Sequence, residues 1–154
     1  MKLILVITLF FFISLGVSNC FAQKLPIWDD VSRSFEIKKG SQEVILVHYF
    51  ATWCAPCMKE LPAFDSLRKV LSTDNAQFVF ISMDIKNTRK LAKTLSNLRL
   101  PGKVFYLSPT SDSNKIIHPN ASGALPTTVI YYPLGEPILI EGKMTMSEYL
   151  KILR

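Results

Sequence analysis

A seven-residue apolar run leads directly to two closely spaced cysteines, and this order constrains the fold more than any other feature. The run is Val44–Phe50, VILVHYF. Its β-branched and aromatic residues predict a strand buried on both faces. Cys54 and Cys57 follow at the point where the chain enters a helix, which Pro62 is expected to kink. The helix is predicted by an apolar repeat at helical spacing, formed by Leu61, Phe64, Leu67 and Leu71.

The rest of the chain alternates apolar runs with amphipathic stretches, which is typical of an α/β protein. Thr145 and Glu148 have the spacing of a capping box at the start of the last helix. A length of 154 residues fits one domain, so we expect an α/β fold with a mixed central β-sheet flanked by helices. The further expected elements are helices over 29–35, 87–100 and 145–153 and strands over 78–83, 104–107, 127–132 and 137–141.

The first 22 residues have the pattern of a secretory signal peptide. Lys2 precedes an uncharged apolar stretch, Leu3–Val17, and Cys20-Phe21-Ala22 places small residues where a signal peptidase cuts. We therefore predict a signal peptide over residues 1–22 and a domain over 23–154. Two alternatives stay open, a retained membrane anchor and a lipid attached to Cys20. All three place the domain outside the cytoplasm.

Removal of the leader would leave Cys54 and Cys57 as the cysteines of the domain. A structural staple is a poor explanation for them, because a disulfide that closes so short a loop adds little stability in the chain-entropy model. A structural zinc site generally needs two ligand pairs. The remaining candidate ligands, His48 and His118, lie far apart in the sequence. We therefore expect no metal and favour a redox-active pair.

The position of each cysteine predicts its role. Cys54 lies at the start of a helix, where free N–H groups and the helix dipole stabilise a thiolate. Cys57 lies one turn further along, where it can resolve a mixed disulfide by attacking the Cys54 sulfur. Pro56 is tolerated in the first turn because it lacks an N–H that would be unpaired there. Trp53 is expected either to cover the sulfur pair or to pack between helix and sheet.

The run Phe50–Pro62, FATWCAPCMKELP, resembles the TlpA/ResA-like extracytoplasmic branch of the thioredoxin superfamily. That branch reads W-C-x-P-C-x-x-E-x-P, and every fixed residue is present here. A second mark is Leu125-Pro126 before the strand-like TTVI. The resemblance extends over about residues 35–154. It implies a thioredoxin-like fold with a helix–strand insertion before a strand that follows a cis Pro126. It also implies a substrate-binding surface formed by Trp53, Pro56, Leu125 and Pro126.

Two titratable residues near the cysteines are candidates for proton transfer. Glu60 follows Cys57 by three residues, so the two share a helix face. A carboxylate near a buried thiol can take its proton, whereas a glutamate at this spacing can equally be a solvated surface residue; the resemblance favours the catalytic role. His48 stands where the branch often has asparagine. It could relay protons to Cys57, or it could be a core or outward-facing histidine.

Together these features predict a thiol–disulfide oxidoreductase that reduces disulfides of partner proteins through Cys54, Cys57 and Glu60. By resemblance, apocytochrome c is one possible substrate class and a membrane thiol reductant is the electron donor. We expect a monomer with no cofactor beyond its redox-active disulfide. The alternatives are an oxidase or isomerase of folding proteins and a copper-handling module with His48 as third ligand. The net charge of +6 is spread along the chain without a basic run, so no nucleic-acid partner is expected.

Overall fold

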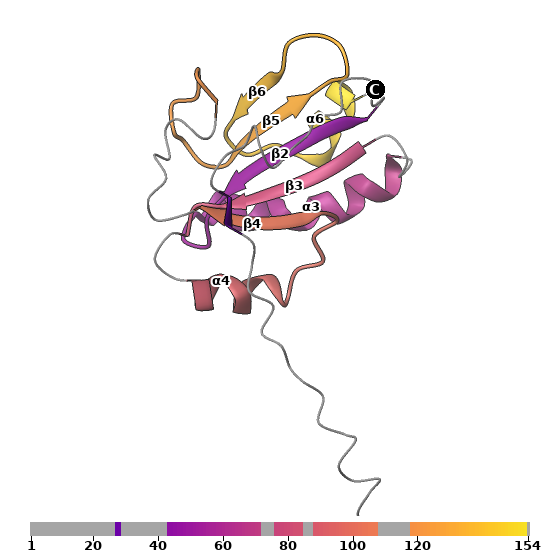
Figure 1. Cartoon of the computed structure of the whole chain (residues 1–154). Helices are drawn as coiled ribbons and strands as arrows, with labels where there is room; N and C mark the ends of the chain where they lie inside the picture. Colours follow the sequence, from indigo (N-terminus) through magenta and orange to yellow (C-terminus); the bar gives the residue numbers. More distant parts are fainter. Residues whose placement is uncertain (1–26, 29–42, 72–75, 85–87, 108–117, 154) are drawn as a thin grey trace, which may run out of the picture.

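A six-stranded sheet forms the centre of the computed structural model, which describes residues 27–28, 43–71, 76–84, 88–107 and 118–153. The strands lie in the order β1-β4-β3-β2-β5-β6 (Figure 1). The first four strands in this order are parallel, whereas β5 and β6 each pair antiparallel with the strand before them. The predicted mixed α/β sheet is thus confirmed. The strands are β1 (Ile27–Trp28), β2 (Val44–Phe50), β3 (Ala76–Ser82), β4 (Lys103–Leu107), β5 (Thr127–Tyr131) and β6 (Ile138–Glu141).

The helices are α3 (Ala55–Val70), α4 (Thr88–Leu95) and α6 (Met146–Leu153). The connections β2–α3–β3 and β3–α4–β4 step in the same direction across the sheet. Because such crossovers are almost always right-handed, both helices belong on the same face, and Figure 1 shows α3 behind the sheet. Leu91 of α4 and Tyr149 of α6 join the buried side chains of α3 in one core cluster.

Strand β2 lies at the centre of this arrangement and alternates its side chains between two buried layers. Leu46 and Phe50 belong to the cluster beneath the three helices. Ile45, Val47 and Tyr49 belong to a second cluster on the other face of the sheet. The prediction of a strand buried on both faces is confirmed, and His48 shares the helix-covered face because it alternates with the same residues.

The structure refines several expected boundaries. Helix α4 ends at Leu95 rather than near residue 100, because the N–H groups of Asn97 and Leu98 turn back to carbonyls only three residues earlier. The predicted capping box is present, since the Glu148 carboxylate accepts the Thr145 N–H at 2.7 Å. Strand β1 was not predicted, because two residues carry no periodic pattern. The signal-peptide region 1–22 and the expected helix 29–35 lie outside the described residues.

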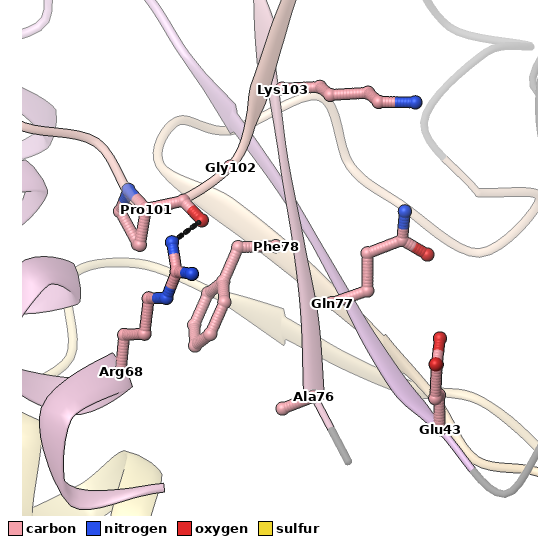
Figure 2. Close-up of a pocket in the computed structure, with 8 residues that line it drawn as sticks. All are labelled: Glu43, Arg68, Ala76, Gln77, Phe78, Pro101, Gly102 and Lys103. Carbon is pink, nitrogen blue, oxygen red and sulfur yellow. Dashed lines mark hydrogen bonds between the residues drawn. The ribbon is translucent and has the colours of Figure 1, made fainter. Parts of the chain in front are cut away.

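A surface cavity of about 300 Å³ lies beside the amino ends of β2 and β3, opposite the end that carries the cysteines (Figure 2). Arg68 donates to the Pro101 carbonyl oxygen at 2.9 Å along its wall. Gly102 is required here, because a Cβ atom at this position would lie 1.9 Å from the backbone oxygen of Phe78. The cavity therefore lies where α3 packs against the turn before β4. Within the described ranges, no helix is long and apolar enough to cross a membrane.

Candidate active site

The two cysteines lie where β2 ends and α3 begins, as predicted. Cys54 is the N-cap of α3, and its Sγ accepts the N–H of Cys57 at 3.2 Å. A disulfide joins the two residues, with an S–S length of 1.98 Å. Pro56 occupies the first turn of the helix. After reduction, the same N–H and the helix dipole would stabilise a thiolate on Cys54.

The two sulfur-bearing residues differ in their access to solvent. Cys54 is 6% exposed, whereas Cys57 is fully buried. A partner can therefore reach the disulfide only from the side of Cys54. Trp53 next to it is 66% exposed, so its ring is not part of the core, contrary to the packing alternative considered from the sequence. It offers an apolar surface to a partner beside Cys54.

The Leu125-Pro126 segment lies at the same edge of the sheet as the cysteines. Its peptide bond is cis, as the resemblance implied. The next residue, Thr127, pairs with Tyr49 near the carboxyl end of β2, and this register brings the segment to that edge. Pro126 is buried, and its carbonyl oxygen accepts the N–H of Gly142 at 2.8 Å. The substrate-binding roles expected for four residues stay predictions: Trp53, Pro56, Leu125 and Pro126.

A buried carboxylate that the sequence did not single out holds the loop before Cys54. Asp84 Oδ2 accepts the backbone N–H of Thr52 at 2.8 Å, and Oδ1 accepts the Thr52 hydroxyl at 2.7 Å. The Ser82 hydroxyl donates to Oδ2 at 2.8 Å. Because Thr52 lies two residues before Cys54, these bonds fix the approach of the chain to the disulfide.

We expect Asp84→Asn to destabilise the oxidised protein by about 1–3 kcal/mol, because one donor of Thr52 or Ser82 would then face an amide NH₂ group in a buried position. Urea unfolding followed by circular dichroism measures the effect. Asp65→Asn is the matched control, since Asp65 lies in an exposed pair with Lys69, and such pairs contribute little. An equal, small effect of both substitutions would show that Asp84 does not hold the loop.

Glu60 is buried rather than solvated, which excludes the surface alternative. It is 1% exposed on the inner face of α3. Its Oε1 accepts the hydroxyl of Tyr149 at 2.7 Å and the N–H of Met144 at 3.2 Å. Desolvation raises the pKa of the Glu60 carboxyl, and these two hydrogen bonds oppose the rise. A carboxyl with a raised pKa one turn after Cys57 is a stronger base than an ordinary glutamate, which suits an acid–base partner of the thiol.

His48 lies in an aromatic layer beneath α3 and is 1% exposed. Its ring centroid is 4.7 Å from that of Phe64, and its Nδ1 lies 2.9 Å from the Thr128 hydroxyl. Burial lowers the pKa of His48 to about 3, so the ring is neutral at physiological pH. Within the described residues, no group of three or more His, Cys, Asp and Glu side chains is placed to hold a metal, and His48 does not form such a set with the cysteines.

A series of hydrogen bonds links His48 to Glu60 through Thr128 and Tyr149, which the sequence analysis did not identify as site residues. Thr128 contacts both His48 and Tyr149, and Tyr149 contacts Glu60. Thr128 lies directly opposite His48 in the antiparallel pairing of β5 with β2. Tyr149 lies within 145–153, which was expected to form the last helix. The signal that could have revealed these hydrogen bonds is the pair of hydroxyl residues, Thr127 and Thr128, at the start of a predicted buried strand.

A family model described as thioredoxin matches residues 29–129 of the chain. A curated relative, sporulation thiol-disulfide oxidoreductase A of Bacillus subtilis, is 32% identical over 68 residues, which is 44% of this chain and 38% of that protein. A thioredoxin of Ictalurus punctatus is 30% identical over 73 residues, 47% of this chain and 66% of the relative. The chain thus spans less than two thirds of the length of each of these two relatives.

A solved thioredoxin-related protein from Neisseria meningitidis serogroup B has the same fold. It superposes with a TM-score of 0.64 at 23% identity, covering 83% of this chain and 94% of that one. This similarity supports the arrangement of sheet and helices described above.

Proposed function

The chain belongs to the thioredoxin family, and we propose that its Cys54–Cys57 pair reduces disulfides of partner proteins outside the cytoplasm. The family model covers most of the described sheet and both cysteines. The disulfide lies at the start of a helix, with Cys54 slightly exposed at 6% and Cys57 fully buried. This is the arrangement that thiol–disulfide exchange requires, because an attacking thiolate and a protected resolving thiol have different access.

In the proposed cycle the reduced pair transfers two electrons to a partner disulfide. The Cys54 thiolate attacks one partner sulfur, so that a mixed disulfide forms and the other partner sulfur leaves as a thiolate. The Cys57 thiol then gives its proton to Glu60, and the resulting thiolate attacks the Cys54 sulfur. The Cys54–Cys57 disulfide forms and the second partner sulfur leaves. A membrane thiol reductant restores the dithiol for the next cycle.

The reducing direction rests on the sequence resemblance, and the buried carboxyl of Glu60 supports the resolving step. A buried Cys57 thiol is a poor nucleophile until it loses its proton. Glu60 shares its helix face at a spacing of three residues, and Oε2 of Glu60 has no hydrogen-bond partner within the described part of the chain. A carboxylate oxygen is thus available to accept the proton in the resolving step.

The proposed location rests on the leader-like residues 1–22, with their positive start and apolar stretch. The name of the Bacillus subtilis relative, a thiol-disulfide oxidoreductase, agrees with the proposed chemistry. Cysteine pairs that later bind a cofactor, as in apocytochrome c, are the substrate class that the sequence resemblance suggests. Such pairs must be reduced before loading, because only a thiolate can serve as a ligand or nucleophile.

The reduction potential of the Cys54–Cys57 pair tests this proposal. The purified protein is equilibrated with graded thiol–disulfide buffers, and the oxidised fraction is read after acid quenching and thiol labelling. We expect a potential at or below about −220 mV, which would mark a reductant. A potential near about −120 mV would instead mark an oxidant of folding proteins and overturn the proposed direction.

A further inference from the structure

Four buried side chains form a continuous polar chain across the core between β2 and α3. His48 Nδ1 lies 2.9 Å from Thr128 Oγ1, and Thr128 Oγ1 lies 2.7 Å from the Tyr149 hydroxyl. The Tyr149 hydroxyl donates to Glu60 Oε1 at 2.7 Å. All four residues are at most 2% exposed, so the chain is enclosed by protein.

The number of protons on these four side chains determines the direction of every hydrogen bond between them. A hydroxyl carries one proton, and Tyr149 donates its own to Glu60. Thr128 must therefore donate its proton to the Tyr149 oxygen. The hydrogen bond between His48 and Thr128 then needs a proton on His48 Nδ1. With Glu60 ionised, His48 is thus held as the Nδ1–H tautomer.

Both ends of the chain carry an open position. His48 Nε2 and Glu60 Oε2 are the buried side-chain atoms that lack a hydrogen-bond partner among the described residues. Buried polar atoms are paired in the great majority of cases, so two exceptions at opposite ends of one chain call for an explanation. The open Nε2 of His48 lets this hydrogen-bond chain take up one proton without breaking an existing hydrogen bond.

We propose that His48, Thr128 and Tyr149 are positioning residues in a reversible hydrogen-bond chain, in which protonation of Glu60 at Oε1 moves the imidazole proton of His48 from Nδ1 to Nε2. In the oxidised protein, where Cys57 carries no thiol proton, one proton is taken up from solvent and none is lost. The new proton binds His48 Nε2, and the Nδ1 proton passes to Thr128. Thr128 gives its former proton to Tyr149, which gives its own to Glu60 Oε1. Each hydroxyl keeps one proton and reverses its direction.

The surroundings favour a change of tautomer over a change of charge at His48. The rings of Phe50, Phe64 and Phe80 surround the imidazole, and burial keeps the pKa of His48 far below neutral. The charged groups that act on Glu60 are Lys143 before α6 and Glu148 within it. Cys57 is the other titratable group on the inner face of α3 once the disulfide is reduced.

The inference rests on the proposed function only in the assignment of Glu60 as the proton acceptor of Cys57. Its test is independent of activity. The oxidised full-length protein is labelled with ¹⁵N-histidine and ¹³C-glutamate and titrated by NMR. Two-bond ¹H–¹⁵N correlations report the tautomer of His48, and the ¹³C shift reports the Glu60 carboxyl. His118 is the internal reference, because the chain has two histidines.

We expect His48 to change from mainly Nδ1–H to mainly Nε2–H as the pH falls, with the same midpoint as the Glu60 carboxyl. Thr128→Ser keeps a hydroxyl and should preserve this coupling. Thr128→Val removes the hydroxyl, so Glu60 should still titrate while the tautomer of His48 stays constant. Tyr149→Phe interrupts the same series of hydrogen bonds at a second position and should also abolish the coupling. In this variant the Glu60 midpoint should rise as well, because a hydrogen bond that lowers the pKa of Glu60 is lost.

Two control variants separate the coupling from general effects on the fold. Tyr132→Phe removes a hydroxyl that bonds the Ile152 carbonyl instead, and it should leave both titrations unchanged. Glu60→Gln should abolish the step in the His48 signal. The proposal is overturned if His48 keeps one tautomer while wild-type Glu60 titrates, or if it follows Glu60 in the Thr128→Val and Tyr149→Phe proteins. A reduction potential typical of an oxidant would contradict the proposed function and leave this coupling intact.

Discussion

Cys54→Ser is expected to lower the rate of protein-disulfide reduction by at least about 1,000-fold, because it removes the attacking sulfur and a nucleophile's loss has effects of this size. Cys57→Ser should instead accumulate a covalent complex with the substrate, since the mixed disulfide on Cys54 then has no resolving thiol. Both effects follow from the geometry, in which Cys54 is the reachable residue and Cys57 is fully buried.

Insulin reduction with dithiothreitol as electron source measures the first effect, and non-reducing gel electrophoresis detects the trapped complex of the second. Cys20→Ser in the full-length chain is the matched control, because it removes a thiol outside the CxxC motif. Turnover that is unchanged in Cys54→Ser, or a complex that is trapped on Cys57 in the Cys54→Ser protein, would contradict the assigned order of attack.

The part of this site that lies within one continuous stretch of sequence was predictable. The apolar run of β2, the CxxC motif and the helix with Glu60 are local patterns, and the capping box of α6 is another. The exposure of Trp53 could not be predicted in the same way, since an aromatic residue next to a cysteine is compatible with either a buried or an exposed ring.

The tertiary contacts that complete the site were not predictable from spacing. Asp84 reaches Thr52 because parallel pairing aligns the ends of β2 and β3. Thr128 meets His48 because β5 pairs antiparallel with β2 in a specific register. A shift of one residue in that register would turn Thr128 to the other face of the sheet. Such contacts depend on the sheet order, which the element pattern leaves open.

Phe64→Ala is expected to destabilise the oxidised protein by about 3–5 kcal/mol, the usual cost of removing a buried phenylalanine ring. Phe64 is fully buried on α3. Its ring centroid lies 5.2 Å from that of Phe80 and 5.3 Å from that of Tyr149, so the substitution leaves a cavity between α3, the sheet and α6. The loss should be larger than that of any single surface hydrogen bond in the molecule.

The same cavity should affect the chemistry, because Phe64 lies on the helix that carries Cys57 and Glu60 and beside the His48 ring. Denaturant unfolding of the oxidised protein gives the free energy, and an unchanged m-value shows that the native state stays compact. Val70→Ala on the same helix is the control; Val70 is 49% exposed, and its truncation should cost no more than about 0.5 kcal/mol. A Phe64→Ala cost close to that of the control would show that α3 is held by contacts other than this aromatic layer. A large cost together with a raised Glu60 pKa would instead show that the layer positions Tyr149 as a donor to that carboxyl.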